Sequence, residues 1–208
     1  MKNIVILISG RGSNMQAIVN AGIPDIRIAA VLSNSATAAG LAWAAERGIP
    51  TDSLNHKDFA SRGAFDQAMM EKIDAYQPDL VVLAGFMRIL TPEFCTRYEG
   101  RLMNIHPSIL PSFTGLHTHE RALAAGCRVA GCTIHFVTSE LDCGPIISQG
   151  VVPIFDNDTA DDIAARVLKV EHRLFPQAVA DFAAGRLKIE GNRVINSRNQ
   201  PEDRSLLA

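Results

Sequence analysis

Two polar side chains stand two positions apart near the end of a predicted strand, and together they could catalyse attack on a carbonyl carbon. Asn104 and His106 follow the alternation of an extended strand, so their side chains should face the same side. Pro107 favours an extended backbone at His106 and preserves this arrangement. An amide N–H can stabilise a developing oxyanion, and an imidazole can exchange protons with reacting groups. The alternative interpretation is a pair of ordinary polar residues at a strand end.

An aspartate in a later loop could complete this group. Asp142 follows a predicted strand and precedes a turn that Gly144 and Pro145 should form. A carboxylate beside an imidazole favours the charged form of the ring, so we expect Asp142 to keep His106 protonated. A turn-capping aspartate is the alternative interpretation.

A glycine-containing loop after the first predicted strand could bind a phosphate. Residues 10–14 read Gly-Arg-Gly-Ser-Asn, and a helix is predicted to follow them. Glycines allow the backbone to approach a phosphate, and N–H groups at a helix start can donate to its oxygens. Met15 stands where the dinucleotide-binding pattern needs a small residue, so we do not expect NAD. A tight strand-to-helix turn is the structural alternative.

The remaining ligand-type residues do not predict a metal site. His117 and His119 have no matching carboxylate or cysteine in the sequence pattern. The four cysteines contain no Cys-x-x-Cys pair, so we expect neither zinc nor a disulfide framework. Free thiols are typical of a reducing cytoplasm, where we expect the protein to act. Arg62 is predicted to open a helix, where its charge opposes the helix dipole, and this favours a role in facing an anion.

Strands and helices must position these side chains. Short apolar runs predict strands at residues 3–8, 26–32, 80–84, 102–106, 129–137 and 145–152. Helical spacing, caps and helix-ending residues predict helices at residues 14–21, 37–47, 61–76 and 118–125, a short one from 92, and a long one from about 158. A hairpin is predicted at residues 187–196. The alternation predicts a Rossmann-like α/β fold, in which helices cover both faces of a mostly parallel sheet. The polar loops should then gather beyond the carboxyl ends of the strands.

Length and composition favour a single globular domain. The chain has 208 residues, of which 47% are hydrophobic, and 22 acidic side chains nearly balance 20 basic ones. The resulting net charge of −2 gives no bulk attraction to nucleic acid or to an anionic membrane. We expect one domain over residues 1–190, followed by a C-terminal hairpin strand and polar tail over residues 191–208.

Five segments, taken in order, give the chain a specific resemblance. They read Ser-Gly-Arg-Gly-Ser-Asn at 9–14, Leu-Ala-Gly-Phe-Met-Arg-Ile-Leu at 83–90, Asn-Ile-His-Pro-Ser at 104–108, Gly-Leu-His-Thr-His at 115–119, and His-Phe-Val-Thr at 135–138 leading to Asp142. With them the chain resembles the folate-dependent formyltransferases that act on glycinamide ribonucleotide. The resemblance covers nearly the whole chain up to about residue 190 and implies the formyltransferase fold. Three loop residues depart from the common family pattern: Ser112, Thr114 and Cys143.

The resemblance implies transfer of a formyl group from 10-formyltetrahydrofolate, as cosubstrate, to the glycine amine of 5'-phosphoribosylglycinamide in purine biosynthesis. It implies a catalytic trio of Asn104, His106 and Asp142. The residues implied to bind the acceptor are Gly12, Ser13, Asn14 and Glu171. The residues implied to bind the folate are Arg62, Met87, Arg88, Ile89, Leu90 and Asn104. No metal is implied, and the partners are small-molecule substrates, with the protein a monomer or a homodimer.

Other readings share the formyl-folate core. A formyltetrahydrofolate hydrolase would use water as acceptor and usually carries an N-terminal regulatory domain. A methionyl-tRNA formyltransferase would use charged tRNA and usually carries a C-terminal barrel. We expect neither additional module beside the predicted domain. A non-catalytic folate- or nucleotide-binding module would keep the loop at residues 12–14 but would have no need for Asn104, His106 and Asp142 together.

Overall fold

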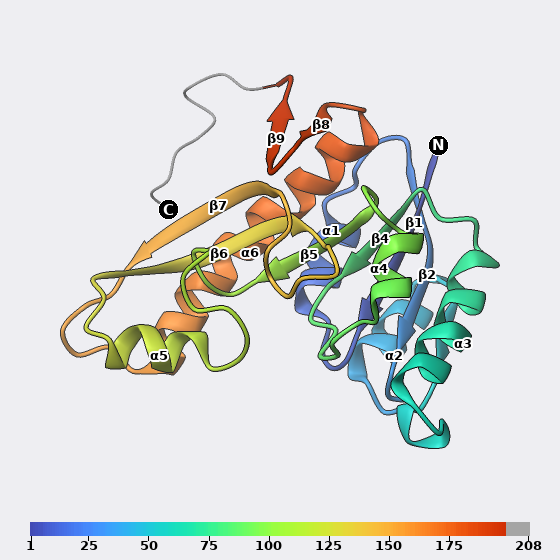
Figure 1. Ribbon diagram of the computed structural model, residues 1–208, viewed down its shortest axis with the longest axis horizontal. Helices are drawn as coiled ribbons and strands as arrows, with labels where there is room; N and C mark the ends of the chain where they lie inside the picture. The colour runs from blue at the N-terminus through green and yellow to red at the C-terminus, as the bar shows by residue number, and fades with distance from the viewer. Residues whose placement is uncertain (199–208) are drawn as a thin grey trace. The chain divides into compact units, whose positions relative to one another are not determined.

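The computed structural model describes residues 1–198, which divide into two compact units (Figure 1). The first unit contains Met1–Asn104 and Val137–Ser139, and the second contains Ile105–Phe136 and the chain from Glu140 onward. Residues 199–208 of the expected tail lie outside the described residues. The assignment of residues 1–190 to a single domain stays a prediction.

The first unit is built on five parallel strands in the order β3-β2-β1-β4-β5. Their bounds are β1 Lys2–Ile8, β2 Ile26–Ser33, β3 Thr51–Ser53, β4 Leu80–Leu83 and β5 Leu102–His106, whose last two residues belong to the second unit. The apolar runs of β1 and β4 are buried along nearly their whole length, as in parallel strands covered on both faces. The sequence analysis missed β3, because this strand has only three residues and none of them is apolar.

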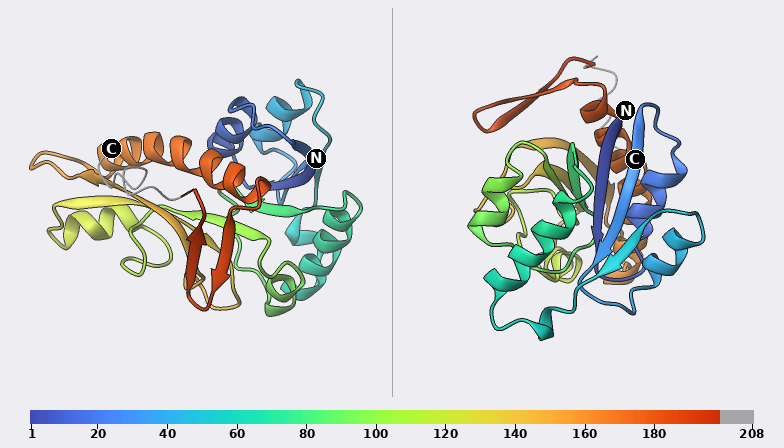
Figure 2. Two further views of the ribbon diagram at one scale, coloured as in Figure 1. Left: turned by 90° about the horizontal axis from the view of Figure 1, so that it is seen from above. Right: turned by 90° about the vertical axis from the view of Figure 1, so that its right-hand side faces the viewer.

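Helices cover both faces of this sheet, as predicted. The helices of the first unit are α1 Ser13–Asn20, α2 Ala39–Ala45, α3 Arg62–Asp74 and α4 Pro92–Arg97, with a short 3-10 helix η1 at His56–Asp58. The right-hand view of Figure 2 shows α1 and α2 on one side of β1 and β2 and α3 on the other. Val5 and Leu7 pack in one cluster with Phe65 of α3, whereas Ile8 lies close to Gly12 before α1. The alternation along β1 therefore serves both helix layers.

The second unit has a different strand pattern. Its elements are α5 Thr118–Ala124, β6 Val129–Phe136, β7 Ile146–Pro153, α6 Ala160–Ala183, β8 Leu187–Glu190 and β9 Arg193–Asn196. β6 and β7 are antiparallel, β7 and β9 are parallel, and β9 and β8 form the predicted antiparallel hairpin. Among the strand pairs described in the two units, parallel pairs predominate.

Small residues let α6 approach the strands closely. A Cβ atom added at Gly150 of β7 would lie 2.2 Å from Cγ1 of Val170 in α6.

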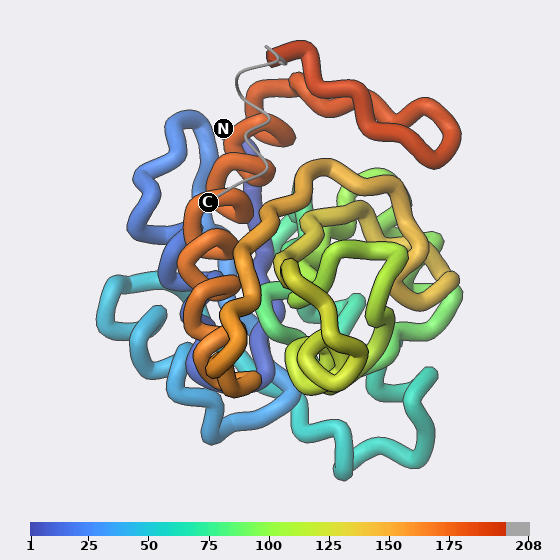
Figure 3. Tube along the Cα trace, turned by 90° about the vertical axis from the view of Figure 1, so that its left-hand side faces the viewer, coloured from blue at the N-terminus to red at the C-terminus, as the bar shows by residue number. Residues whose placement is uncertain are grey.

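At the far end of α6, the buried carboxylate of Asp181 accepts a 2.8 Å hydrogen bond from Nδ2 of Asn196 and pairs with Arg186. These contacts hold the β8–β9 hairpin against the end of the helix, where Figure 3 shows the chain turning from α6 into the hairpin.

Candidate active site

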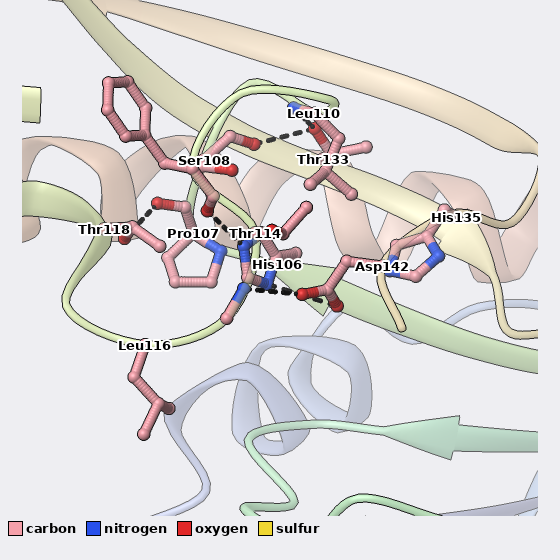
Figure 4. A network of polar contacts seen from close by, with 12 residues as sticks. His106, Pro107, Ser108, Leu110, Thr114, Leu116, Thr118, Thr133, His135 and Asp142 are labelled. Atoms are coloured by element: carbon pink, nitrogen blue, oxygen red, sulfur yellow. Dashed lines mark hydrogen bonds and ion pairs between the residues drawn. The ribbon is translucent and has the colours of Figure 1, made fainter. Parts of the chain in front are cut away.

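The histidine and the aspartate that the sequence singled out face each other in the second unit. His106 is the last residue of β5, and Asp142 lies in the loop between β6 and β7. Nδ1 of His106 is 3.5 Å from Oδ1 of Asp142, and their side chains are only 7% and 8% exposed (Figure 4). The structure thus brings together two groups that are 36 positions apart in the chain.

Each group of this pair also binds the loop that follows β5. Nε2 of His106 is 3.0 Å from the carbonyl oxygen of Phe113. Oδ2 of Asp142 accepts a 2.8 Å hydrogen bond from the backbone N–H of Gly115. Both partners of the His106 ring are therefore acceptors, and a ring that donates to both carries two protons. The charged imidazolium expected from the sequence stays a prediction.

Local hydrogen bonds hold this loop in place. The Thr133 hydroxyl of β6 donates to the carbonyl of Ser108 at 2.7 Å and accepts from the N–H of Leu110 at 3.0 Å. The Thr118 hydroxyl donates to the carbonyl of Pro107 at 2.6 Å (Figure 4). Asp142 itself has a positive φ of 54°, a conformation that Asp and Asn tolerate better than most residues. The loop after β5 is therefore fixed by side chains of the second unit.

Asn104 lies on the same strand as His106, two positions earlier. It pairs with Leu83 of β4 in the parallel register and is half-buried. Because side chains alternate along a strand, Asn104 and His106 share one face of β5. A catalytic role for Asn104 stays a prediction.

A second buried histidine accompanies the pair, and the sequence analysis did not give it a role. His135 of β6 is almost fully buried, and Figure 4 shows it on the other side of Asp142 from His106. Burial lowers the pKa of His135 below its ordinary value of 6.5, although the charge of Asp142 acts in the opposite direction. A neutral His135 ring has no charge to pair with the Asp142 carboxylate, so His106 is the histidine placed to form an ion pair with it. Its sequence signals were its place one residue before the end of β6 and its presence in the segment 135–138 that carries the family resemblance.

The expected phosphate loop forms the start of α1 in the first unit. Gly12 is the N-cap residue of this eight-residue helix and has a positive φ of 68°. A Cβ atom there would lie 3.0 Å from Cε of Met15, so glycine suits both the conformation and the space. Because glycine has no side chain, the N–H groups of the first helical turn, which begins at Ser13, are not covered by a capping group.

The other predicted binding residues are distributed over both units. Residues 87–90 connect β4 to α4, and Met87 is 67% exposed while Ile89 is 58% exposed. Arg62 is exposed at the first position of α3, as predicted. Glu171 is buried in α6 of the second unit. Burial and the charge of Glu171 raise the pKa of the Cys132 thiol to about 12, so this thiol remains protonated.

The described residues contain no cluster of three or more His, Cys, Asp or Glu side chains with the geometry to hold a metal ion. The cysteines of the described chain are all free. None of the helices in the described part has the length and apolar character needed to cross a bilayer. A cavity of about 160 Å³ borders the loop after His106, and it is lined in part by Phe113 and His119. Burial lowers the pKa of His119, so its ring is neutral at pH 7.

Known proteins are similar to this chain in sequence and in fold. Residues 2–179 match the protein family described as formyl transferase. The chain is 52% identical over 193 residues to phosphoribosylglycinamide formyltransferase of Escherichia coli K12, and the match covers 91% of each chain. It is 43% identical to the trifunctional purine biosynthetic protein adenosine-3 of Homo sapiens, covering 91% of this chain and 19% of that protein. The crystal structure of glycinamide ribonucleotide transformylase 1 from Symbiobacterium toebii superposes with a TM-score of 0.91 at 46% identity, covering 94% of both chains.

Proposed function

The chain belongs to the formyl transferase family, and on this basis we propose that it transfers a formyl group from 10-formyltetrahydrofolate to the glycine amine of 5'-phosphoribosylglycinamide. The products are formylglycinamide ribonucleotide and tetrahydrofolate, and the reaction belongs to de novo purine biosynthesis. Relatives with this enzyme name align along nearly the full length of both chains, which supports the same activity here.

One structural observation carries the mechanism: the buried pair of His106 and Asp142 at the end of the strand that also bears Asn104. The acceptor amine attacks the formyl carbon, a carbon–nitrogen bond forms, and the carbonyl oxygen becomes an oxyanion. The amide N–H of Asn104 and the charged ring of His106 stabilise this oxyanion. The oxyanion takes the place of the Phe113 carbonyl as the acceptor of the Nε2 proton.

Proton transfers complete the reaction. The attacking amine loses a proton, which Asp142 accepts through a water molecule. The oxyanion re-forms the carbonyl as the bond between the folate nitrogen and the formyl carbon breaks, and that nitrogen receives a proton from His106 as tetrahydrofolate leaves. The proton held by Asp142 then returns to the His106 ring through water, which restores the pair. A group with two acceptor partners, such as the His106 ring, is suited to hold and deliver that proton.

The remaining predicted residues bind the two substrates. Gly12, Ser13 and Asn14 hold the phosphate at the start of α1, where backbone N–H groups and the helix dipole favour an anion. Glu171 contacts the ribose of the acceptor. The folate is bound by Arg62 and by residues 87–90, whose exposed apolar side chains offer contact surface. No protein metal ligand is required. The free cysteines fit action in a reducing cytoplasm.

An absorbance assay of folate deformylation tests this function. We expect a signal only when 5'-phosphoribosylglycinamide is present. Equal deformylation without the acceptor would identify a formyltetrahydrofolate hydrolase instead. Folate binding without deformylation in either condition would identify a non-catalytic binding module.

A further inference from the structure

The segment 87–90, to which we assign folate binding, belongs to neither a helix nor a strand, so its backbone has to be held by other parts of the chain. We infer that two residues outside it, Ser9 and Asp66, are positioning residues that fix its two ends and thereby set the affinity for folate. This inference rests on the proposed role of segment 87–90 in folate binding. All contacts that carry it lie within the first unit.

Asp66 of α3 holds the carboxyl end of the segment. Its Oδ2 atom accepts a 2.7 Å hydrogen bond from the backbone N–H of Thr91, the residue directly after the segment. Asp66 is 0% exposed, and its other oxygen, Oδ1, has no hydrogen-bond partner among the described residues. Burying a carboxyl group costs free energy because the group loses its contacts with water. Asp66 is buried for a single hydrogen bond to the Thr91 N–H, which calls for a functional explanation.

The same region of α3 also holds a side chain of the segment. The guanidinium carbon of Arg88 lies 4.9 Å from the centroid of the Phe65 ring, and Phe65 precedes Asp66 in the helix. Thr91 caps α4 by accepting a hydrogen bond from the N–H of Phe94 at 3.3 Å. Asp66 therefore determines where the segment ends and α4 begins. Arg62, which we propose to contact folate directly, stands one helical turn before Asp66.

Ser9 holds the amino end of the segment. Its hydroxyl accepts a 2.8 Å hydrogen bond from the backbone N–H of Met87 and donates a 2.7 Å bond to Oδ1 of Asn34. The backbone N–H of Ser9 donates to the carbonyl of Gly85 at 3.1 Å. The hydroxyl is thus oriented by Asn34, and Ser9 joins the loop after β1 to the loop after β4. Both ends of the segment are fixed by polar side chains that do not belong to it.

The test separates positioning from general stability. In Asp66→Leu, which lacks the acceptor, KM for 10-formyltetrahydrofolate should rise about tenfold, because one buried hydrogen bond to the backbone is lost. Asp66→Asn keeps a side-chain oxygen that can accept the hydrogen bond from Thr91, so its KM for 10-formyltetrahydrofolate should stay within about twofold of the parent value. KM for the formyl acceptor and kcat should change little in either variant, because the loss affects folate binding alone.

Ser9→Ala should show the same selective rise in folate KM. Its matched control is Ser35→Ala, because the Ser35 hydroxyl is exposed and bonds only to Thr37 among the hydrogen bonds described for it. Dissociation constants for tetrahydrofolate, measured by calorimetry, should follow the KM values. If Asp66→Leu does not fold, the folate KM and the tetrahydrofolate affinity of Ser9→Ala test the positioning role instead.

The outcomes distinguish this inference from the proposed function. A parent enzyme without formyl transfer would overturn the proposed function, whatever the variants bind. Parent-like tetrahydrofolate affinity in folded Asp66→Leu, or in Ser9→Ala if the former does not fold, would overturn the positioning role. Equal losses in acceptor KM and folate KM would also overturn it, because they would indicate general damage.

Discussion

Replacement of Asp142 by asparagine should lower kcat by about 10- to 150-fold while the protein folds normally. Asparagine fits the site well. It tolerates the positive φ of 54° at this position, and its amide oxygen can still accept the hydrogen bond from Gly115. Its amino group would then face Nδ1 of His106 and donate to an unprotonated nitrogen, so the variant favours the neutral ring.

The separation of the pair sets the magnitude. Nδ1 of His106 and Oδ1 of Asp142 are 3.5 Å apart. Two unit charges at that separation attract by about 5 kcal/mol at an effective dielectric constant of about 20, before the cost of desolvating them is subtracted. The net value of a hydrogen bond to a charged group is smaller, about 1.5–3 kcal/mol. Each 1.4 kcal/mol is a factor of about ten in rate, which gives the expected range.

Steady-state formyl transfer with saturating substrates measures this effect, and thermal unfolding followed by circular dichroism verifies the fold. The parent and the variant should unfold at similar temperatures. A folded Asp142→Asn enzyme that turns over at nearly the parent rate would refute the reasoning and remove Asp142 from the mechanism.

Three further changes have defined outcomes. Asn104→Ala should reduce kcat about 100- to 1,000-fold by removing one oxyanion donor, with unfolding unchanged; a smaller loss than tenfold in stopped-flow turnover would argue against that role. Gly12→Ala should raise KM for the acceptor and lower stability by about 1–2 kcal/mol, because alanine is strained at φ 68° and its Cβ meets Met15; urea unfolding and acceptor titration measure both effects. Asp158→Asn should lower stability at neutral pH, because hydrogen bonds from Arg166 and from the backbone reduce the pKa of Asp158 from 3.8 to about 2. A lowered carboxylate pKa stabilises the fold above pH 3.8, so the parent-to-variant difference in unfolding free energy should shrink from pH 4 to pH 2; a constant difference in denaturation at stepped pH would contradict this.

The strands and helices that position the site were largely predictable, because burial on both faces leaves a continuous apolar signal. β1 and β4 carry such runs. The short helix predicted from residue 92 is confirmed as α4, which Thr91 caps and which begins at Pro92. The direction of β7 was harder to infer. The strand is antiparallel to β6, in keeping with the absence of a crossover helix between them, but an apolar run alone does not encode direction.

The candidate site was predictable only in part. Asn104 and His106 are joined by strand alternation, whereas the approach of Asp142 depends on a loop that folds back through the Gly115 hydrogen bond. The hydrogen bonds of Ser9 with Met87 and of Asp66 with Thr91, directly after segment 87–90, left no sequence signal. A serine after a strand and an aspartate in a helix are common, and only the folded chain brings them to the two ends of the segment.

The fate of the formyl carbon tests the central claim most directly. The enzyme is given 10-formyltetrahydrofolate labelled with ¹³C in the formyl group, together with 5'-phosphoribosylglycinamide, and the products are analysed by mass spectrometry. The account predicts that the label appears as a formamide on the glycine nitrogen of the ribonucleotide. Label recovered as free formate, with the ribonucleotide unlabelled, would contradict it.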